Sequence, residues 1–176
     1  MMNMTEIIKH NLEIMYKSYH NTFENLSMGG EHNNKPCVKS KEEAISGDRL
    51  KEGCNKCKKY EENKSVDAIS FNKNKFIFIE FKIKQRQNMK NELHKLSKTL
   101  KDKFYYSLKC FRHNLDKDEV WEPRPVEKIF VYKLDDRVRN QRIELKPLKY
   151  ELKDTNIVIM RSEDFDEKIN NYKYNI

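Results

Sequence analysis

The side chains of this sequence best suited to chemistry are Asp67, Glu80 and Lys82. Glu80 and Lys82 interrupt a run that is otherwise apolar from Phe76 to Ile83, and a charge in such a run is costly unless it has a partner or a function. Residues two apart on a strand project from the same face, so Glu80 and Lys82 are predicted to lie side by side. Asp67 would add a second carboxylate, and carboxylate oxygens are ligands that suit Mg²⁺ or Mn²⁺.

The position of Asp67 depends on the turn between a predicted strand at residues 66–71 and the strand that carries Glu80. If the loop has two residues, Asn72 pairs with Lys75, and a loop of four residues gives the same pairing. Asp67 then lies directly opposite Glu80, with the two Cβ atoms roughly 5 Å apart. Two carboxylates at that distance repel each other unless a cation lies between them or one is protonated. A loop of three residues would instead place Asp67 on the other face.

This arrangement resembles the D…ExK signature of the PD-(D/E)xK nuclease superfamily, in which the Asp and the ExK stand on adjacent strands of a hairpin. Here Asp67 is followed by Glu80-Phe81-Lys82, and Val66 stands where the family has proline. The resemblance implies that Asp67 and Glu80, with the backbone carbonyl of Phe81, hold Mg²⁺ or Mn²⁺. It also implies that Lys82 positions or activates the attacking water, or stabilises charge at the phosphate. The alternative is a plain salt bridge, buried or at an edge, that joins Glu80 to Lys82 or to the neighbours of Asp67.

The other elements are predicted mainly from the spacing of apolar residues. They are an amphipathic helix at 6–26, a long helix at 85–113, strands at 128–134 and 155–160, and a short final helix capped by Ser162. The segment from Glu42 to Leu50 fits either a helical turn or the first strand of the sheet. The resemblance implies a restriction-endonuclease-like α/β fold, with an αβββαβ core whose mixed central sheet is flanked by helices. The last strand and helix would be additions to that core.

Composition limits the class of protein. The chain has 176 residues, the usual length of one domain, so residues 1–176 are predicted to form a single nuclease-like domain with an irregular, cysteine-containing insertion at about 27–64. The net charge of +8 favours nucleic acid as the partner, with DNA first, although an AT-rich genome would also enrich Lys and Asn. The mean hydropathy is −0.98, and no run approaches the roughly 20 apolar residues of a membrane span. Because the N-terminus also lacks the apolar region of a secretory signal, we expect a cytoplasmic protein.

The four cysteines suggest a second metal. Cys54 and Cys57 form a C-x-x-C pair, and two thiolates at that spacing can bind one tetrahedral Zn²⁺. Cys37 and Cys110 are further candidate ligands, with nearby histidines as alternatives. Unliganded thiols in a reducing compartment are the other interpretation, and a redox-active pair is a third.

Two classes of function follow. The first is a metal-dependent nuclease that hydrolyses phosphodiester bonds of DNA in restriction, phage defence or repair, as a homodimer or with a partner protein. The second is a non-catalytic nucleic-acid-binding or protein-interaction adaptor on the same fold. Glu13 and Glu24 are candidates for a further metal ligand, because some members of the resembled superfamily add a Glu from the first helix. Basic side chains that could contact a phosphate backbone are Lys84, Arg86, Lys90, Arg137, Arg139 and Arg142.

Overall fold

A computed structural model describes residues 4–28, 35–53, 65–73, 75–84, 89–115, 125–134 and 146–175. The helices in this part of the chain are α1 (Met4–Tyr19), α2 (Phe23–Leu26), α3 (Gly47–Gly53), α4 (Met89–Leu115), α5 (Lys146–Glu151) and α6 (Ser162–Glu167). The strands are β1 (His20–Thr22), β2 (Glu43–Ser46), β3 (Ala68–Asn72), β4 (Lys75–Lys84), β5 (Val126–Leu134) and β6 (Ile157–Arg161). Two 3₁₀ turns, η3 (Lys153–Thr155) and η4 (Ile169–Asn171), follow α5 and α6.

The strands form one six-stranded mixed sheet in the order β1-β2-β3-β4-β5-β6. Neighbouring strands from β1 to β4 run antiparallel, whereas β4, β5 and β6 run parallel to one another. The β3–β4 hairpin has the predicted register, with Asn72 paired to Lys75 and Ala68 to Ile79. Lys73, in the turn, adopts a left-handed backbone conformation with φ of 49°, as tight hairpin turns require.

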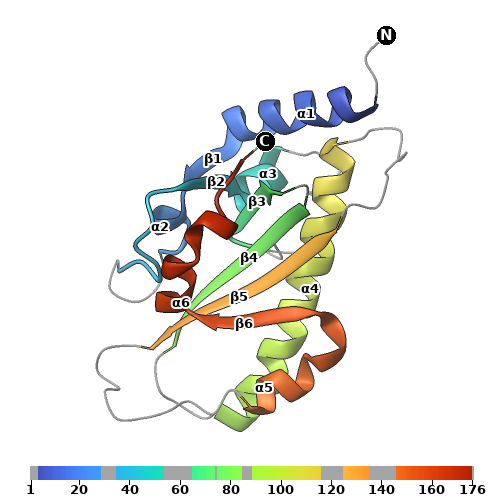
Figure 1. The fold of residues 1–176 in the computed structure, drawn as a ribbon. Coiled ribbons are helices and arrows are strands. Elements are labelled where there is room, and N and C mark those ends of the chain that lie inside the picture. Colours follow the sequence, from blue (N-terminus) through green and yellow to red (C-terminus); the bar gives the residue numbers. More distant parts are fainter. Residues whose placement is uncertain are drawn as a thin grey trace.

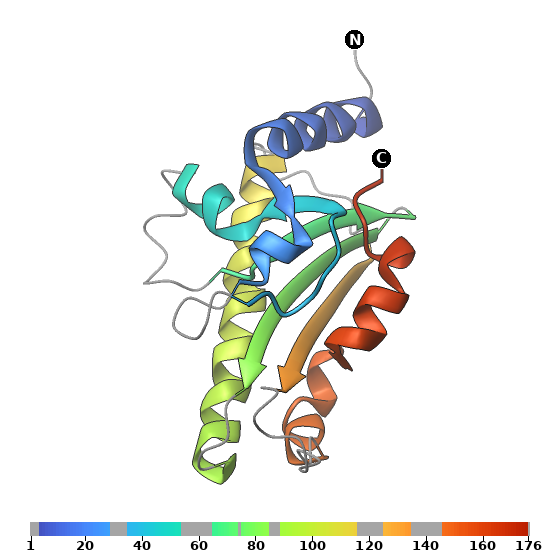
Figure 2. The same cartoon turned by 90° about the vertical axis from the view of Figure 1, so that its left-hand side faces the viewer.

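Helices cover both faces of this sheet (Figures 1 and 2). The apolar side chains of α1, α4 and α5 pack on one face, against Phe76, Phe78 and Phe130. Phe23 of α2 and Phe165 of α6 pack on the other face. β4 is therefore a central strand covered on both sides, as the apolar residues on both of its faces predicted. The predicted apolar stripe of the long helix is also buried at Leu93, Leu100, Phe104 and Phe111.

The first helix is shorter than predicted. It ends at Tyr19, and the chain continues as the edge strand β1, which pairs with β2. Asn21 and Thr22 explain the change, because polar side chains that bond nearby backbone groups compete with a helix. The Asn21 side chain accepts a hydrogen bond from the Thr22 N–H at 2.9 Å, and the Thr22 hydroxyl caps α2 by accepting from the Asn25 N–H at 3.2 Å.

Two other boundaries also differ from the prediction. The segment at 42–50, for which strand and helix were alternatives, contains both, since β2 runs directly into α3. The final helix is not capped by Ser162. Its N-cap is Arg161, which makes no side-chain capping bond, and Ser162 is the buried first residue of α6. In the residues that the structure describes, no helix combines the length and the apolarity needed to cross a membrane.

Candidate functional site

The hairpin brings the two predicted carboxylates together. The regular β3–β4 ladder ends at Ala68 and Ile79, and Asp67 and Glu80 are the next residues on each side. The Asp67 carboxylate accepts a hydrogen bond of 2.6 Å from the backbone N–H of Phe81, through Oδ2. Both side chains lie on the face covered by α4, because Ile69 and Phe78, two residues from each, belong to the core on that face.

Lys103 of α4 is the described cation that contacts this pair directly. Its Nζ lies 2.6 Å from Glu80 Oε1, within a charge-assisted hydrogen bond. The Glu80 side chain is only 8% exposed and that of Lys103 20%, so the pair is largely removed from water. Sequence reasoning missed Lys103, because it grouped this lysine with the other charged residues of the helix. The available signal was its place directly before Phe104, at the margin of the apolar stripe.

The carboxyl groups of the site have raised pKa values. Burial, followed by the charge of Asp67, raises the pKa of Glu80 from 4.5 to about 8, against the opposing effect of Lys103. Burial also raises the pKa of Asp67 from 3.8 to about 6, although Lys103 and the Phe81 N–H oppose the rise. Burial alone would lower the pKa of Lys103, but Glu80 and Asp67 outweigh it, and that pKa lies above its usual value. Because Lys103 shifts the pKa of both carboxyl groups and both of them shift that of Lys103, the three groups do not titrate independently.

One oxygen of Glu80 has no partner. Oε1 accepts from Lys103, whereas Oε2 is buried and makes no hydrogen bond with any described residue. An unpaired buried carboxylate oxygen is costly, and together with Asp67 it provides the hard oxygen ligands that Mg²⁺ and Mn²⁺ prefer. These donors fit the predicted ion. Within the described residues, no three His, Cys, Asp or Glu side chains converge as a metal-binding cluster, so the fit rests on Asp67 and Glu80.

A third carboxylate, Asp48 of α3, contributes to the electrostatics. Its charge raises the pKa of Asp67, and its side chain accepts a hydrogen bond from the Ser65 hydroxyl. Sequence reasoning did not identify Asp48, which lies on the segment whose structure was left open between strand and helix. We regard it as part of the charge environment of the site.

The segment that carries Asp67 is held tightly on both sides. The Val66 N–H donates to the hydroxyl of Ser107, a buried residue of α4, at 2.7 Å. The Gly47 N–H donates to the backbone carbonyl of Asp67 at 3.2 Å. Gly47 also lies so close that a Cβ atom there would be 1.9 Å from the Val66 carbonyl oxygen. Only glycine fits this approach, so close backbone packing fixes where the Asp67 carboxylate stands.

Lys82 lies at the open side of the site. It is exposed and shares the face of β4 with Glu80, since the two are separated by one residue. Its charge lowers the pKa of both Glu80 and Asp67, which places it within electrostatic reach of both. The Lys82 ammonium is therefore the cation of the site that can meet a ligand from solvent, whereas that of Lys103 is paired to Glu80.

The other predicted contacts are only partly described. Lys84 ends β4 and Lys90 lies in the first turn of α4, but their side chains are outside the described part of the structure. Four further predicted contacts lie entirely outside the described residues: Arg86, Arg137, Arg139 and Arg142. Glu13 is exposed on α1, and Glu24 forms an ion pair with Lys41. Their predicted roles stay predictions.

The cysteines do not share one site in the described residues. Cys37 is a buried free thiol in the core on the α6 side of the sheet, and burial raises its pKa to about 12. Cys110 lies on α4 in the opposite core and is disulfide-bonded, so it presents no thiolate to a metal unless it is reduced. Cys54 and Cys57 lie outside the described residues. The zinc site stays a prediction.

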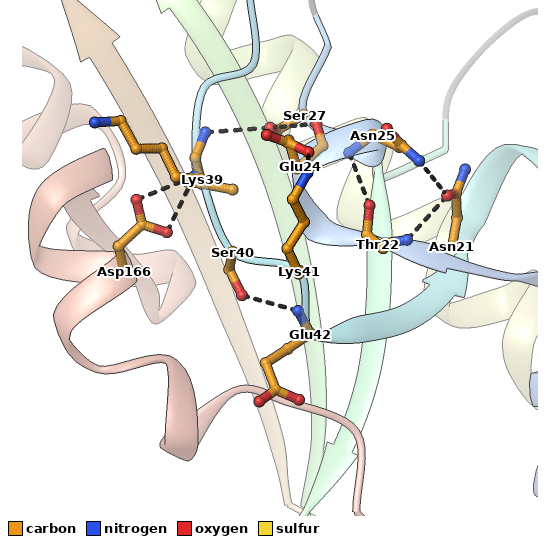
Figure 3. A network of polar contacts seen from close by, with 11 residues as sticks. Asn21, Thr22, Glu24, Asn25, Ser27, Lys39, Ser40, Lys41, Glu42 and Asp166 are labelled. Atoms are coloured by element: carbon orange, nitrogen blue, oxygen red, sulfur yellow. Dashed lines mark hydrogen bonds and ion pairs between the residues drawn. The ribbon is translucent and has the colours of Figure 1, made fainter.

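A hollow of about 600 Å³ on the α6 side of the sheet is a weaker candidate. Three of its charged side chains already have partners: Lys41 pairs with Glu24, Glu42 with Lys173, and Asp166 accepts from a backbone N–H. Figure 3 shows the Lys39 N–H donating to the Asp166 carboxylate and Lys41 reaching Glu24. These contacts join α2, the segment before β2 and α6, so the network serves to attach these elements rather than to bind a ligand.

Comparisons of this chain with models of known protein families, with curated proteins and with solved structures find no match. What can be said of function therefore comes from the geometry of the Asp67–Glu80 site and from the resemblance of its motif.

Proposed function

We propose that this protein is a metal-dependent nuclease that hydrolyses phosphodiester bonds of DNA, built on a restriction-endonuclease-like core. The observation that carries the proposal is the position of Asp67 and Glu80 directly beyond the last β3–β4 pair, with the exposed Lys82 on the face of Glu80 and with a buried Glu80 oxygen that no described residue bonds. With the short elements β1, α2 and α3 treated as insertions, the order α1, β2, β3, β4, α4, β5 supports the proposal, because it matches the αβββαβ core of that class.

Asp67 and Glu80 would hold Mg²⁺ or Mn²⁺, with the Phe81 carbonyl as the further ligand that the motif implies. Such an ion supplies Lewis acidity at the phosphate and lowers the pKa of a bound water. Lys82, at the solvent side, orients the attacking water or offsets negative charge that develops on the phosphate. Lys103 favours the ionised form of Glu80, the form that binds a cation. Each role follows from one side chain's position and charge.

The second candidate function is a non-catalytic adaptor. The ion pair of Lys103 and Glu80 favours it, because an ammonium at 2.6 Å already offsets the buried charge. An adaptor needs no metal at the hairpin, and its Asp67 and Glu80 would serve only to join α4 to the sheet.

The deciding experiment is cleavage of plasmid and single-stranded DNA with Mg²⁺ or Mn²⁺. It compares wild type, Glu80→Gln and Glu167→Gln, a matched control whose carboxylate is exposed on α6, on the opposite side of the sheet. We expect metal-dependent cleavage by wild type and the control, and its loss in Glu80→Gln. Folded, monodisperse wild type that cleaves no substrate with either metal would favour the adaptor. Cleavage that persists in Glu80→Gln would show that the hairpin is not the active site.

A further inference from the structure

A row of three side chains leads away from the carboxylates across the parallel half of the sheet. Lys82 of β4 is the register partner of Tyr132 on β5, and Tyr132 is the partner of Arg161 on β6. In a sheet, directly paired residues project from the same face, and this is the face of Glu80 and α4. All three residues lie at the C-terminal ends of their strands, two or fewer residues from the last.

The C-terminal ends of parallel strands are where open α/β sheets bind ligands. β4, β5 and β6 run in the same direction, and the arrowheads of β4 and β5 point the same way in Figure 2. The row therefore lies at the end of the sheet where a ligand bound to the Lys82 ammonium could continue across β5 and β6.

Tyr132 fixes Arg161 in this row. The tyrosine is only 9% exposed, and its Oη accepts a hydrogen bond of 3.4 Å from Arg161 Nε. Arg161 itself is exposed, and no ion pair joins it to any described carboxylate. The charges of the exposed Asp164 and Glu163, in the following turn of α6, act on it from nearby. Among the described residues, only Tyr132 accepts a hydrogen bond from the Arg161 guanidinium, so its other nitrogens are available to a ligand.

We propose that Arg161, oriented by Tyr132, contacts a phosphate of the substrate other than the scissile one, so that the substrate is an extended polynucleotide strand crossing β4, β5 and β6. Adjacent strands lie about 4.8 Å apart, which places the backbone of Arg161 about 10 Å from that of Lys82. This span exceeds one step of a nucleic-acid strand, which is about 3.4 Å along a duplex axis and longer in an extended strand, so Arg161 would meet a different phosphate from the one at Lys82. Guanidinium groups bind phosphate through paired hydrogen bonds.

This inference rests on the proposed nuclease function, and it is tested with substrates of two sizes. Bis(p-nitrophenyl) phosphate is a small diester that fits only the carboxylate site, whereas a single-stranded oligonucleotide of about 20 residues is longer than the whole row. The variants are Arg161→Ala, Tyr132→Phe, and Lys168→Ala, a matched control that removes an exposed positive charge just after α6.

We expect Arg161→Ala to raise KM for the oligonucleotide about tenfold with kcat nearly unchanged, since a phosphate contact remote from the bond contributes binding in ground state and transition state alike. The dependence of log affinity on log salt should fall by about 0.7, the value for one contact with a single strand. Tyr132→Phe should raise KM less, because the charge remains and only its orientation is lost. Turnover of the small diester should be the same in all variants.

Equal oligonucleotide KM values in Arg161→Ala and Lys168→Ala, with wild type active, would overturn the Arg161 contact and leave the nuclease proposal standing. An equal loss of activity on the small diester in Arg161→Ala would overturn it as well, since the effect would then be on the active site or the fold. Fluorescence anisotropy of the same oligonucleotide separates the two proposals if wild type cleaves nothing. Weaker binding by Arg161→Ala would then support the contact although the nuclease proposal had failed, whereas no binding by wild type would overturn both.

Discussion

The raised pKa of Glu80 makes a specific prediction for the stability of Glu80→Gln. In the unfolded chain this carboxyl loses its proton near 4.5, whereas in the folded protein it holds it to about 8. Between these values the folded state binds more protons than the unfolded state, so the free energy of unfolding falls as pH rises. A single carboxyl group with a raised folded-state pKa lowers the free energy of unfolding by at most about 1.4 kcal/mol per pH unit.

The window from pH 6 to pH 8 is dominated by Glu80. Asp67 has a folded pKa of about 6, so it adds a smaller slope that fades above pH 6 and that both proteins share, because both retain Asp67. Across these two units, wild type should lose about 2 to 3 kcal/mol relative to Glu80→Gln, which has no proton to lose. Glutamine keeps an amide oxygen that can accept from Lys103 but carries no negative charge; this weaker bond shifts the unfolding free energy of Glu80→Gln equally at every pH in the window and leaves the slope unchanged.

The measurement is urea unfolding of both proteins at pH 6, 7 and 8 with a chelator present. We expect the difference in unfolding free energy to grow with pH in favour of Glu80→Gln. Saturating Mn²⁺ should abolish the slope of wild type, because a metal at the site holds Glu80 ionised across the range. Parallel curves for the two proteins in the chelator would refute the reasoning, since they would mean that Glu80 ionises at an ordinary pH.

Three other substitutions test the supports of the site. Lys103→Met should raise the pKa of Glu80 further, because it removes the main cation that lowers it, and the rise of activity with pH should move to higher pH than in wild type. Gly47→Ala should destabilise the fold by several kcal/mol in thermal unfolding, since its Cβ would meet the Val66 carbonyl at 1.9 Å. Ser107→Ala should destabilise by about 1 to 3 kcal/mol by leaving the Val66 N–H unpaired; an unchanged melting temperature would mean that water replaces the hydroxyl.

The hairpin could be predicted because its information is local. The turn type, the alternation of side chains and the apolar character of β4 jointly fix the register, and a slip by one residue would move the whole set of side chains to the wrong face. The pairing of Asn72 with Lys75, and with it the approach of Asp67 to Glu80, therefore follows from a short stretch of sequence.

Lys103 and the end of α1 could not be predicted in the same way. An apolar stripe shows which side of a helix is buried, but the long side chains at its margin point to solvent or to the sheet according to the helix's exact rotation. The Lys103 side chain points toward the sheet because its ammonium forms an ion pair with Glu80. The helix ends at Tyr19 because the local bonds of Asn21 and Thr22 weaken it and because β2, more than twenty residues later, offers β1 a partner. The second cause is tertiary pairing, which overrides helical periodicity and cannot be read from the local sequence.

The electrostatics of the site argue against a purely structural role. An ion pair that only joined α4 to the sheet would need one carboxylate, and apolar side chains of similar volume would serve at least as well. Here a second carboxylate, Asp67, stands close to the first and raises its pKa, and the second oxygen of Glu80 is buried without a partner among the described residues. Both features destabilise the fold and neither improves the packing. Opposed carboxylates with strongly perturbed pKa values are typical of sites arranged for a ligand or a reaction, and a divalent cation is the ligand that would offset both costs at once.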